Sequence, residues 1–306
     1  MDETVTLRER IGQFLGFERV ETPVDYDVQE SVPFSGYIRH RITYTAADGD
    51  VVPAYLLLPE GEGPYPAVIV HHQHASQRHL GKSEVVGIAG DPLQAFAPAL
   101  AQRGFAVLAP DSVCFEDRRK NATGTQVHED DHLQHFVEMG NRLVLGDTLM
   151  RKVLADASRG LALLAHHPRV DARRIGALGH SYGGNTVLFQ AALEPRIAFA
   201  AASGALCSYA YKRQHGIPLE MALIIPGFAA HWDLHHLLVA TAPRPLLIVS
   251  ADGDKYSQDA GEVIARARPH EHITHYHTSG GHALTPDRLE QILTFMVAEA
   301  ARLRDG

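Results

Sequence analysis

The sequence predicts an α/β fold, with a mostly parallel central sheet, helices on both faces and lid-like insertions. Short continuous apolar runs at 67–70, 105–110 and 245–250 are typical of strands buried on both faces, as in parallel sheets. Helix-like segments at 92–103 and 148–166 lie between such runs. Strands that alternate with helices in this way indicate strand–helix–strand units, and therefore a parallel sheet.

The N-terminal part of the chain has a different pattern. Residues 5–15 indicate a short helix, and the segment from there to Pro33 is expected to be irregular. Residues 37–45 and 51–58 are expected to pair as a hairpin, because Asp48-Gly49 between them favours a tight turn. The other elements expected are strands at 197–202 and 272–277 and helices at 258–267 and 286–302.

The chain of 306 residues is predicted to form one α/β domain over 1–306. No repeat or low-complexity linker divides it. Residues 1–36 are interpreted as an N-terminal extension, and 112–146 and 206–238 as insertions. The first insertion follows a strand end, so we expect it to lie over the edge of the sheet where parallel sheets bind ligands.

Composition and charge exclude several classes of protein. The net charge is −8 and no basic stripe is present, which argues against a nucleic-acid partner. No apolar run is long enough to span a membrane, and residues 1–10 do not resemble a signal peptide. Two cysteines, Cys114 and Cys207, are too few for a disulfide scaffold and predict a reducing, cytoplasmic location. A homo-oligomer is compatible with this composition.

The stretch Gly179-His180-Ser181-Tyr182-Gly183 matches the G-x-S-x-G pattern between an apolar run and a helix-like segment. Its glycines permit a turn too tight for side chains, and the strain lifts the serine hydroxyl clear of the backbone. The pattern therefore predicts Ser181 as a nucleophile, with the N–H of Tyr182 facing the same space. Alone, the motif is also compatible with an ordinary glycine-rich turn.

An acid and a base follow Ser181 in the order that this motif predicts, namely Asp254 and then His282. A serine hydroxyl needs an adjacent base, and that base needs a third group to fix its tautomer. Asp254 comes just after a predicted strand, and His282 lies in a glycine-rich loop before the last helix. These three residues are the predicted catalytic set.

Each of these two assignments has competitors. Asp252 lies two residues before Asp254, and we favour Asp254 because of its register after the strand. Asp252 is the alternative acid, or simply a turn former beside a glycine. His275 and His277 compete with His282, but they alternate on a predicted strand and are expected to be partly packed.

The second oxyanion donor is expected in the loop after the strand at 67–70, which ends in His71-His72-Gln73-His74. By register, His74 is the preferred backbone N–H donor and Gln73 the close alternative. The substrate-binding candidates are Gln73, His180 and Trp232, the last within an aromatic-rich insertion that could line a pocket.

Two histidine patterns could indicate a metal instead. His128-Glu129-Asp130-Asp131-His132 matches the H-E-x-x-H zinc pattern, but its flanks are polar and no third ligand stands out downstream. His71, His72 and His74 are poorly placed for shared ligation, because adjacent residues on a strand point to opposite faces. We therefore expect no metal and no organic cofactor.

These motifs resemble the α/β-hydrolase superfamily, specifically its dienelactone-hydrolase and acetyl-xylan-esterase-like branch. The resemblance rests on the 179–184 stretch, on 243–248 with Asp254, and on Gly281-His282, and it covers roughly 37–302. It departs at Gln73, where a glycine is usual, and at Ser181, where dienelactone hydrolases use cysteine.

The resemblance implies a serine carboxylic-ester hydrolase acting on a small-molecule acyl ester or lactone through an acyl-enzyme. The alternatives are a serine peptidase or amidase of the prolyl-oligopeptidase type, and a non-catalytic binding module on the same fold.

Overall fold

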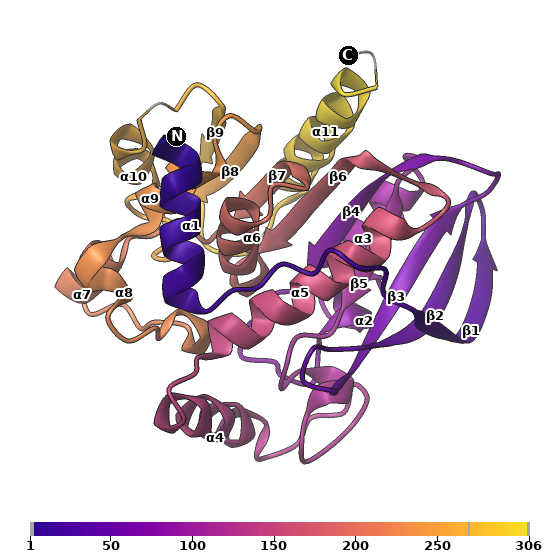
Figure 1. Ribbon diagram of the computed structural model, residues 1–306, viewed down its shortest axis with the longest axis horizontal. Coiled ribbons are helices and arrows are strands. Elements are labelled where there is room, and N and C mark those ends of the chain that lie inside the picture. The colour runs from indigo at the N-terminus through magenta and orange to yellow at the C-terminus, as the bar shows by residue number, and fades with distance from the viewer. Residues whose placement is uncertain (1–2, 269, 305–306) are drawn as a thin grey trace.

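The computed structural model describes residues 3–268 and 270–304, and in this part of the chain one nine-stranded sheet forms the centre (Figure 1). The strand order is β1-β2-β3-β5-β4-β6-β7-β8-β9. From β1 to β5 each strand is antiparallel to its neighbour, and from β5 to β9 all neighbours are parallel. The strands are β1 Tyr26–Phe34, β2 Tyr37–Thr45, β3 Val51–Pro59, β4 Tyr65–His71, β5 Ala106–Pro110, β6 Val170–His180, β7 Ile197–Ser203, β8 Leu246–Ala251 and β9 Ile273–Thr278.

Helices cover both faces of this sheet, and a hydrophobic core lies under each set. On β8, Leu246 and Ile248 face one core, and Leu247 and Val249 face the other, which explains why the run is continuously apolar. The mostly parallel sheet with helices on both faces is thus confirmed. The first core includes α1 Glu3–Leu15, α5 Leu149–His166, α6 Tyr182–Leu193, α9 Leu234–Thr241 and α10 Ala260–Arg266; the second includes α2 Lys82–Val85, α3 Phe96–Ala101 and α11 Pro286–Arg302.

Two local predictions were wrong. The segment expected to be irregular contains β1, an edge strand that pairs with β2 through a bulge near Val28. The side chains of β1 are mostly exposed, so its sequence lacks the apolar alternation by which a half-buried strand is predicted. The helix expected over 92–103 is divided into a 3₁₀ turn, η1 Pro92–Gln94, and α3, because Ala95 adopts a non-helical ψ of 58°.

Both predicted insertions contain short helices, and they meet each other. The first holds the 3₁₀ turn η2 Glu116–Arg118 and α4 Asp131–Val144, which stands away from the sheet at the bottom of Figure 1. The second holds α7 Tyr209–Gln214, η3 Met221–Leu223, α8 Phe228–His231 and the start of α9. Because α4 contacts η3, the two insertions are joined above the parallel strands.

None of the helices in the described ranges has both the length and the apolar character needed to cross a membrane. A spanning helix needs about 20 mostly apolar residues. The 18-residue helix α5 illustrates the difference, because Arg151, Lys152, Asp156 and Arg159 lie along it. The cytoplasmic location stays a prediction.

Candidate active site

Ser181 lies at the sharp turn between β6 and α6, at the carboxyl end of the parallel strands. Its φ of 55° and ψ of −115° are strained for a residue with a side chain. The turn is held in place because the Ser181 N–H donates to the carbonyl oxygen of Ser203 on β7 (2.8 Å). The backbone therefore has the strand–turn–helix geometry that the motif predicted.

Glycine is required on both sides of Ser181 by the close approach of the backbone. A methyl group added at Gly183 would lie 2.0 Å from the carbonyl oxygen of His71, the last residue of β4. One added at Gly179 would lie 2.3 Å from the carbonyl carbon of Gly183. Both distances are well below a van der Waals contact, so any larger residue would open the turn.

The side chains of Ser181, His282 and Asp254 form a continuous hydrogen-bonded chain. Ser181 Oγ lies 2.7 Å from His282 Nε2, and His282 Nδ1 lies 2.9 Å from Asp254 Oδ1. Because a carboxylate only accepts, the Nδ1–H of His282 donates to it, and Nε2 is left to accept from the serine hydroxyl. Asp254 follows Ser181 by 73 positions, and His282 follows Asp254 by 28. The loops after β8 and β9 bring these three residues together.

Asp254 is buried and fully hydrogen-bonded, with an exposed fraction of 1%. Besides His282, it accepts from the Tyr256 N–H (3.0 Å) and from Ser257 Oγ (2.7 Å). Burial alone would raise the pKa of Asp254, but the hydrogen bond and charge of His282, with the bonds from its loop, hold the pKa below its usual value. The carboxylate is therefore kept ionised beside the histidine.

The competitors lie elsewhere. Asp252 is exposed, and its Oδ1 accepts from the Gly280 N–H (2.9 Å), so it braces the loop that carries His282. His275 and His277 lie on β9, and both contact Ser250 Oγ, at 2.7 and 2.8 Å. Neither of these two histidines lines the cavity at Ser181.

The loop after β4 places His74, but not Gln73, on the cavity that contains Ser181 and Tyr182. His72 fixes this loop: its Nδ1–H donates to the Gln73 carbonyl oxygen (2.7 Å), and its Nε2 accepts from the Ser112 N–H (3.1 Å). Burial lowers the pKa of His72 to about 4, which keeps the ring in the neutral form that these two bonds need.

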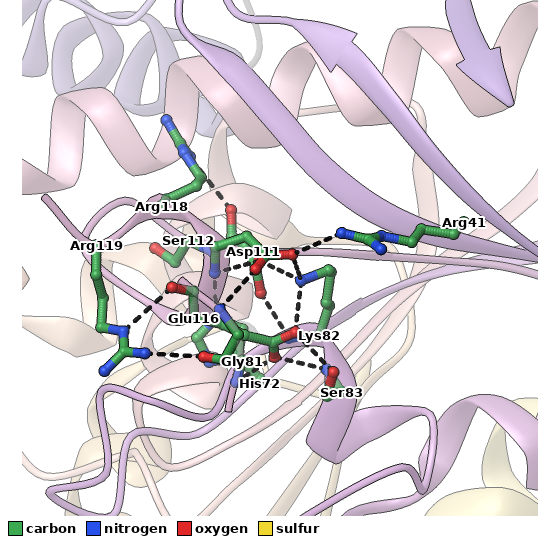
Figure 2. A network of polar contacts seen from close by, with 12 residues as sticks. Arg41, His72, Gly81, Lys82, Ser83, Asp111, Ser112, Glu116, Arg118 and Arg119 are labelled. Atoms are coloured by element: carbon green, nitrogen blue, oxygen red, sulfur yellow. Dashed lines mark hydrogen bonds and ion pairs between the residues drawn. The ribbon is translucent and has the colours of Figure 1, made fainter. Parts of the chain in front are cut away.

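A buried ion cluster lies close to His72 (Figure 2). The Lys82 ammonium, at the start of α2, lies 2.7 Å from Asp111, 2.5 Å from Glu116 and 2.7 Å from Asp117. Among the described residues, these three carboxylates are close enough together to hold a metal ion, but the Lys82 ammonium lies among them and supplies the cation. The cluster joins α2, the end of β5 and η2.

A cavity of about 260 Å³ opens at Ser181. The insertions supply much of its wall: His132 comes from α4, and Lys212, Leu219, Glu220 and Met221 come from the second insertion. Its other lining residues are His74, Ala75, Ser76, Arg78, Ser181, Tyr182, Asn185, Gly204, Pro218, Tyr256 and His282.

None of the three substrate-binding candidates lines this cavity. The Gln73 amide is buried and donates to Glu84 Oε1 (3.1 Å). The His180 ring is buried beside His282, at 5.0 Å between ring centres, and contacts Ser203 Oγ (3.0 Å). Trp232 packs against Phe14 and Phe228 on the flank of the first core. These three side chains are held by neighbouring groups in this structure, and their contact with substrate stays a prediction.

Four polar residues that line the cavity, Arg78, Asn185, Lys212 and Glu220, were not singled out from the sequence. Arg78, Lys212 and Glu220 lie in segments without a motif, 31 to 103 positions away from Ser181. Asn185 lies one helical turn after Ser181, and that spacing on α6 could have indicated a side chain facing the site.

The H-E-x-x-H pattern does not form a helical pair of histidines. Helix α4 begins at Asp131, so His128 precedes it and His132 lies within it. His128 Nδ1 instead contacts the Asn121 side chain (2.8 Å), while His132 lines the cavity. Two ligands on one helical face are therefore not available here.

A family model described as acetyl xylan esterase (AXE1) matches residues 18–219, well over half of the chain. The chain belongs to this family. The match includes Ser181, Tyr182 and His74 and ends before Asp254 and His282. The acetyl xylan esterase family consists of serine hydrolases that act on ester bonds, so this member is an enzyme of that kind, which decides against a non-catalytic binding module. The dienelactone-hydrolase part of the expected resemblance stays a prediction.

Relatives of this acetyl xylan esterase family member agree in sequence and in fold. YtaP of Bacillus subtilis (strain 168) is 31% identical over 217 residues, which cover 68% of this chain and 67% of YtaP. The glucuronoyl esterase from Solibacter usitatus superposes with a TM-score of 0.70 at 17% identity, covering 95% of this chain and 92% of the other. Acetyl xylan esterase 1 from Thermoanaerobacterium sp. superposes with a TM-score of 0.64 at 17% sequence identity, and the match covers 97% of this chain and 94% of the other. The fold is that of the α/β-hydrolases.

Proposed function

We propose that this protein hydrolyses a small acyl ester through Ser181, His282 and Asp254. The observation that carries the proposal is the chain of two hydrogen bonds, 2.7 and 2.9 Å long, from Ser181 Oγ through His282 to Asp254. A nucleophile, a base and an orienting acid within hydrogen-bond distance are the arrangement that acyl transfer requires.

In the proposed reaction, Ser181 Oγ attacks the acyl carbon and His282 Nε2 takes its proton. Asp254 holds the tautomer of His282 and stabilises the imidazolium that forms. The N–H groups of Tyr182 and His74 donate to the oxyanion of the tetrahedral intermediate. His282 then gives the proton to the leaving alcohol, and it activates the water that cleaves the acyl-enzyme. No step requires a metal or an organic cofactor.

The proposed substrate is a small molecule in which a short acyl chain esterifies a carbohydrate-like alcohol. Two features support this class: the cavity is small, about 260 Å³, and its wall is polar as well as apolar. The description of the family and the name of one similar structure, acetyl xylan esterase, also point to an acetyl ester of a carbohydrate.

The test replaces Ser181 by alanine. Turnover of p-nitrophenyl acetate should fall by a factor on the order of 10⁶ in kcat, as for other serine hydrolases, with little change in the unfolding midpoint. Ser250→Ala is the matched control, because Ser250 also contacts histidine but lies outside the cavity. Retention of a tenth of the activity by Ser181→Ala would refute the proposal. Faster cleavage of an aminoacyl p-nitroanilide would favour the peptidase alternative.

A further inference from the structure

Two buried cations line the cavity beside Ser181 without an acidic partner. Arg78 and Lys212 are 4% and 3% exposed, and within the described residues neither makes an ion pair with a carboxylate. Arg78 donates instead to two neutral rings, from Nε to His135 (3.2 Å) and from Nη1 to His74 (3.3 Å). Burial lowers the pKa of Lys212, and the nearby acidic groups do not offset it. A desolvated cation without a partner is costly, so its place in a cavity indicates a ligand.

Among the described residues, Glu220 is the acid that lines the same cavity, but it does not neutralise both cations. Its Oε2 accepts from the Ala222 N–H (2.8 Å), and its Oε1 is buried with no hydrogen-bond partner. Burial raises the pKa of Glu220 to about 7, so near neutral pH a fraction of it carries no charge. With Glu220 ionised, two cations and one acid still leave the wall with one net positive charge.

Water can supply hydrogen bonds to these groups, but it cannot supply the missing negative charge. A carboxylate can, and its two oxygens match the planar donor fork of arginine. A phosphate monoester would bring nearly two negative charges close to Glu220. A ligand with one carboxylate therefore neutralises the net charge of the cavity wall best.

We propose that the ester cleaved at Ser181 bears a second, free carboxylate, and that Arg78 and Lys212 bind this group and so select the substrate. This rests on the proposed function. The carboxylate is carried either by the acyl chain or by the alcohol, and Glu220 opposes its binding through repulsion of like charge.

The experiment compares matched pairs of esters that differ only in the charged group. On the acyl side the pair is p-nitrophenyl hemiglutarate and p-nitrophenyl isoheptanoate; on the alcohol side it is the acetates of γ-hydroxybutyrate and of isohexanol. The readout is the ratio of kcat/KM for the acid to kcat/KM for its neutral partner. Uncatalysed hydrolysis is subtracted in each case.

In at least one pair the wild-type protein should favour the acid. Lys212→Met, which keeps the length of the side chain, should lower that ratio about 10- to 100-fold, the scale of a hydrogen bond to a charged group. Glu220→Gln should raise it. Arg213→Met is the matched control, because Arg213 is exposed on the same helix and does not line the cavity at Ser181, and it should leave the ratio unchanged.

A wild-type ratio at or below one in both pairs would overturn the proposal, as would a ratio that Lys212→Met does not change. A preference for an ester bearing a phosphate over both acids would also overturn it in favour of another anion. If no ester is turned over, the proposed function fails, and calorimetry then decides the binding claim separately. Glutarate should bind the wild-type protein and glutaramide should not. Equal binding of the two compounds would refute the claim that Arg78 and Lys212 bind a carboxylate.

Discussion

Two buried lysines in this protein have opposite surroundings. Lys82 is 1% exposed and contacts three carboxylates, whereas Lys212 is 3% exposed and forms no ion pair with any described residue. Burial alone would lower the pKa of both. For Lys82 the charges of Asp111 and Glu116 overcome that effect and raise the pKa, and for Lys212 the pKa stays lowered.

The difference separates charges that are satisfied within the protein from the charges that we propose bind a ligand. The Lys82 cluster joins α2, the end of β5 and η2 (Figure 2), so its charges are satisfied within the protein. Arg78, Lys212 and Glu220 line one cavity, and the Oε1 atom of Glu220 is buried without a hydrogen-bond partner. Substitutions in the two regions should therefore affect different properties, stability in the first and substrate choice in the second.

Among the buried charges, the largest effect is expected at Asp254, whose carboxylate accepts hydrogen bonds from its own loop and from His282. Asp254→Asn should lower kcat by about 10⁴, or roughly 5–6 kcal/mol of barrier, because the tautomer of His282 is no longer fixed. Asp252→Asn removes only a charge, since its amide oxygen can still accept from the Gly280 N–H, and should cost less than about tenfold, the scale of ~1 kcal/mol. Steady-state kinetics of both variants tests this, and the reverse ranking would contradict it.

The next effect concerns stability. Lys82→Met should reduce the free energy of unfolding by about 3–5 kcal/mol, because it leaves three carboxylates close together without a cation. Lys120→Met is the control: Lys120 is an exposed lysine paired with Glu138, and its loss should cost about 1 kcal/mol or less. Urea denaturation of both variants measures the difference. Equal, small losses would mean that the buried cluster does not stabilise the fold.

A smaller effect is expected from the matched change in the cavity. Lys212→Met should leave the free energy of unfolding within about 1 kcal/mol of the wild type, or raise it, since it removes a buried charge that has no ion-pair partner. The same urea titration applies. A loss as large as that of Lys82→Met would show that Lys212 is a structural charge, and the contrast between the two lysines would disappear.

The smallest effect should appear in the pH dependence of stability. The pKa of Asp254 is lower in the folded protein than its ordinary value of about 3.9, so the unfolded chain binds the proton more readily. The stability that its ionised form contributes is present above that ordinary pKa and is lost as the pH falls through the folded-state pKa. The wild type should thus lose more stability than Asp254→Asn between neutral pH and about pH 3. If the difference in free energy of unfolding between the wild type and Asp254→Asn stays constant over this pH range, the lowered pKa of Asp254 is contradicted.

The sequence by itself determined the parts of this protein that depend on neighbours along the chain. Continuous apolar runs predicted the strands of the parallel sheet, because a strand buried on both faces has apolar side chains at successive positions. The glycines around Ser181 predicted the tight turn, because only glycine fits where Gly183 meets the backbone of His71. The order of Ser181, Asp254 and His282 predicted three side chains that the fold brings within hydrogen-bond distance.

Only the tertiary structure decided which side chains reach the cavity. The sequence offered Gln73 and Trp232 as substrate-binding residues. In the structure the Gln73 amide donates to Glu84, and the Trp232 ring packs against Phe228. Arg78, in the loop after β4, and Lys212, in the second insertion, carry no motif. They line the same cavity because the second insertion folds over the sheet, where its η3 contacts α4 of the first insertion. Backbone turns depend on local sterics, whereas the wall of a cavity depends on contacts between distant segments. That is why the sequence indicated the nucleophile, and the fold decided what surrounds it.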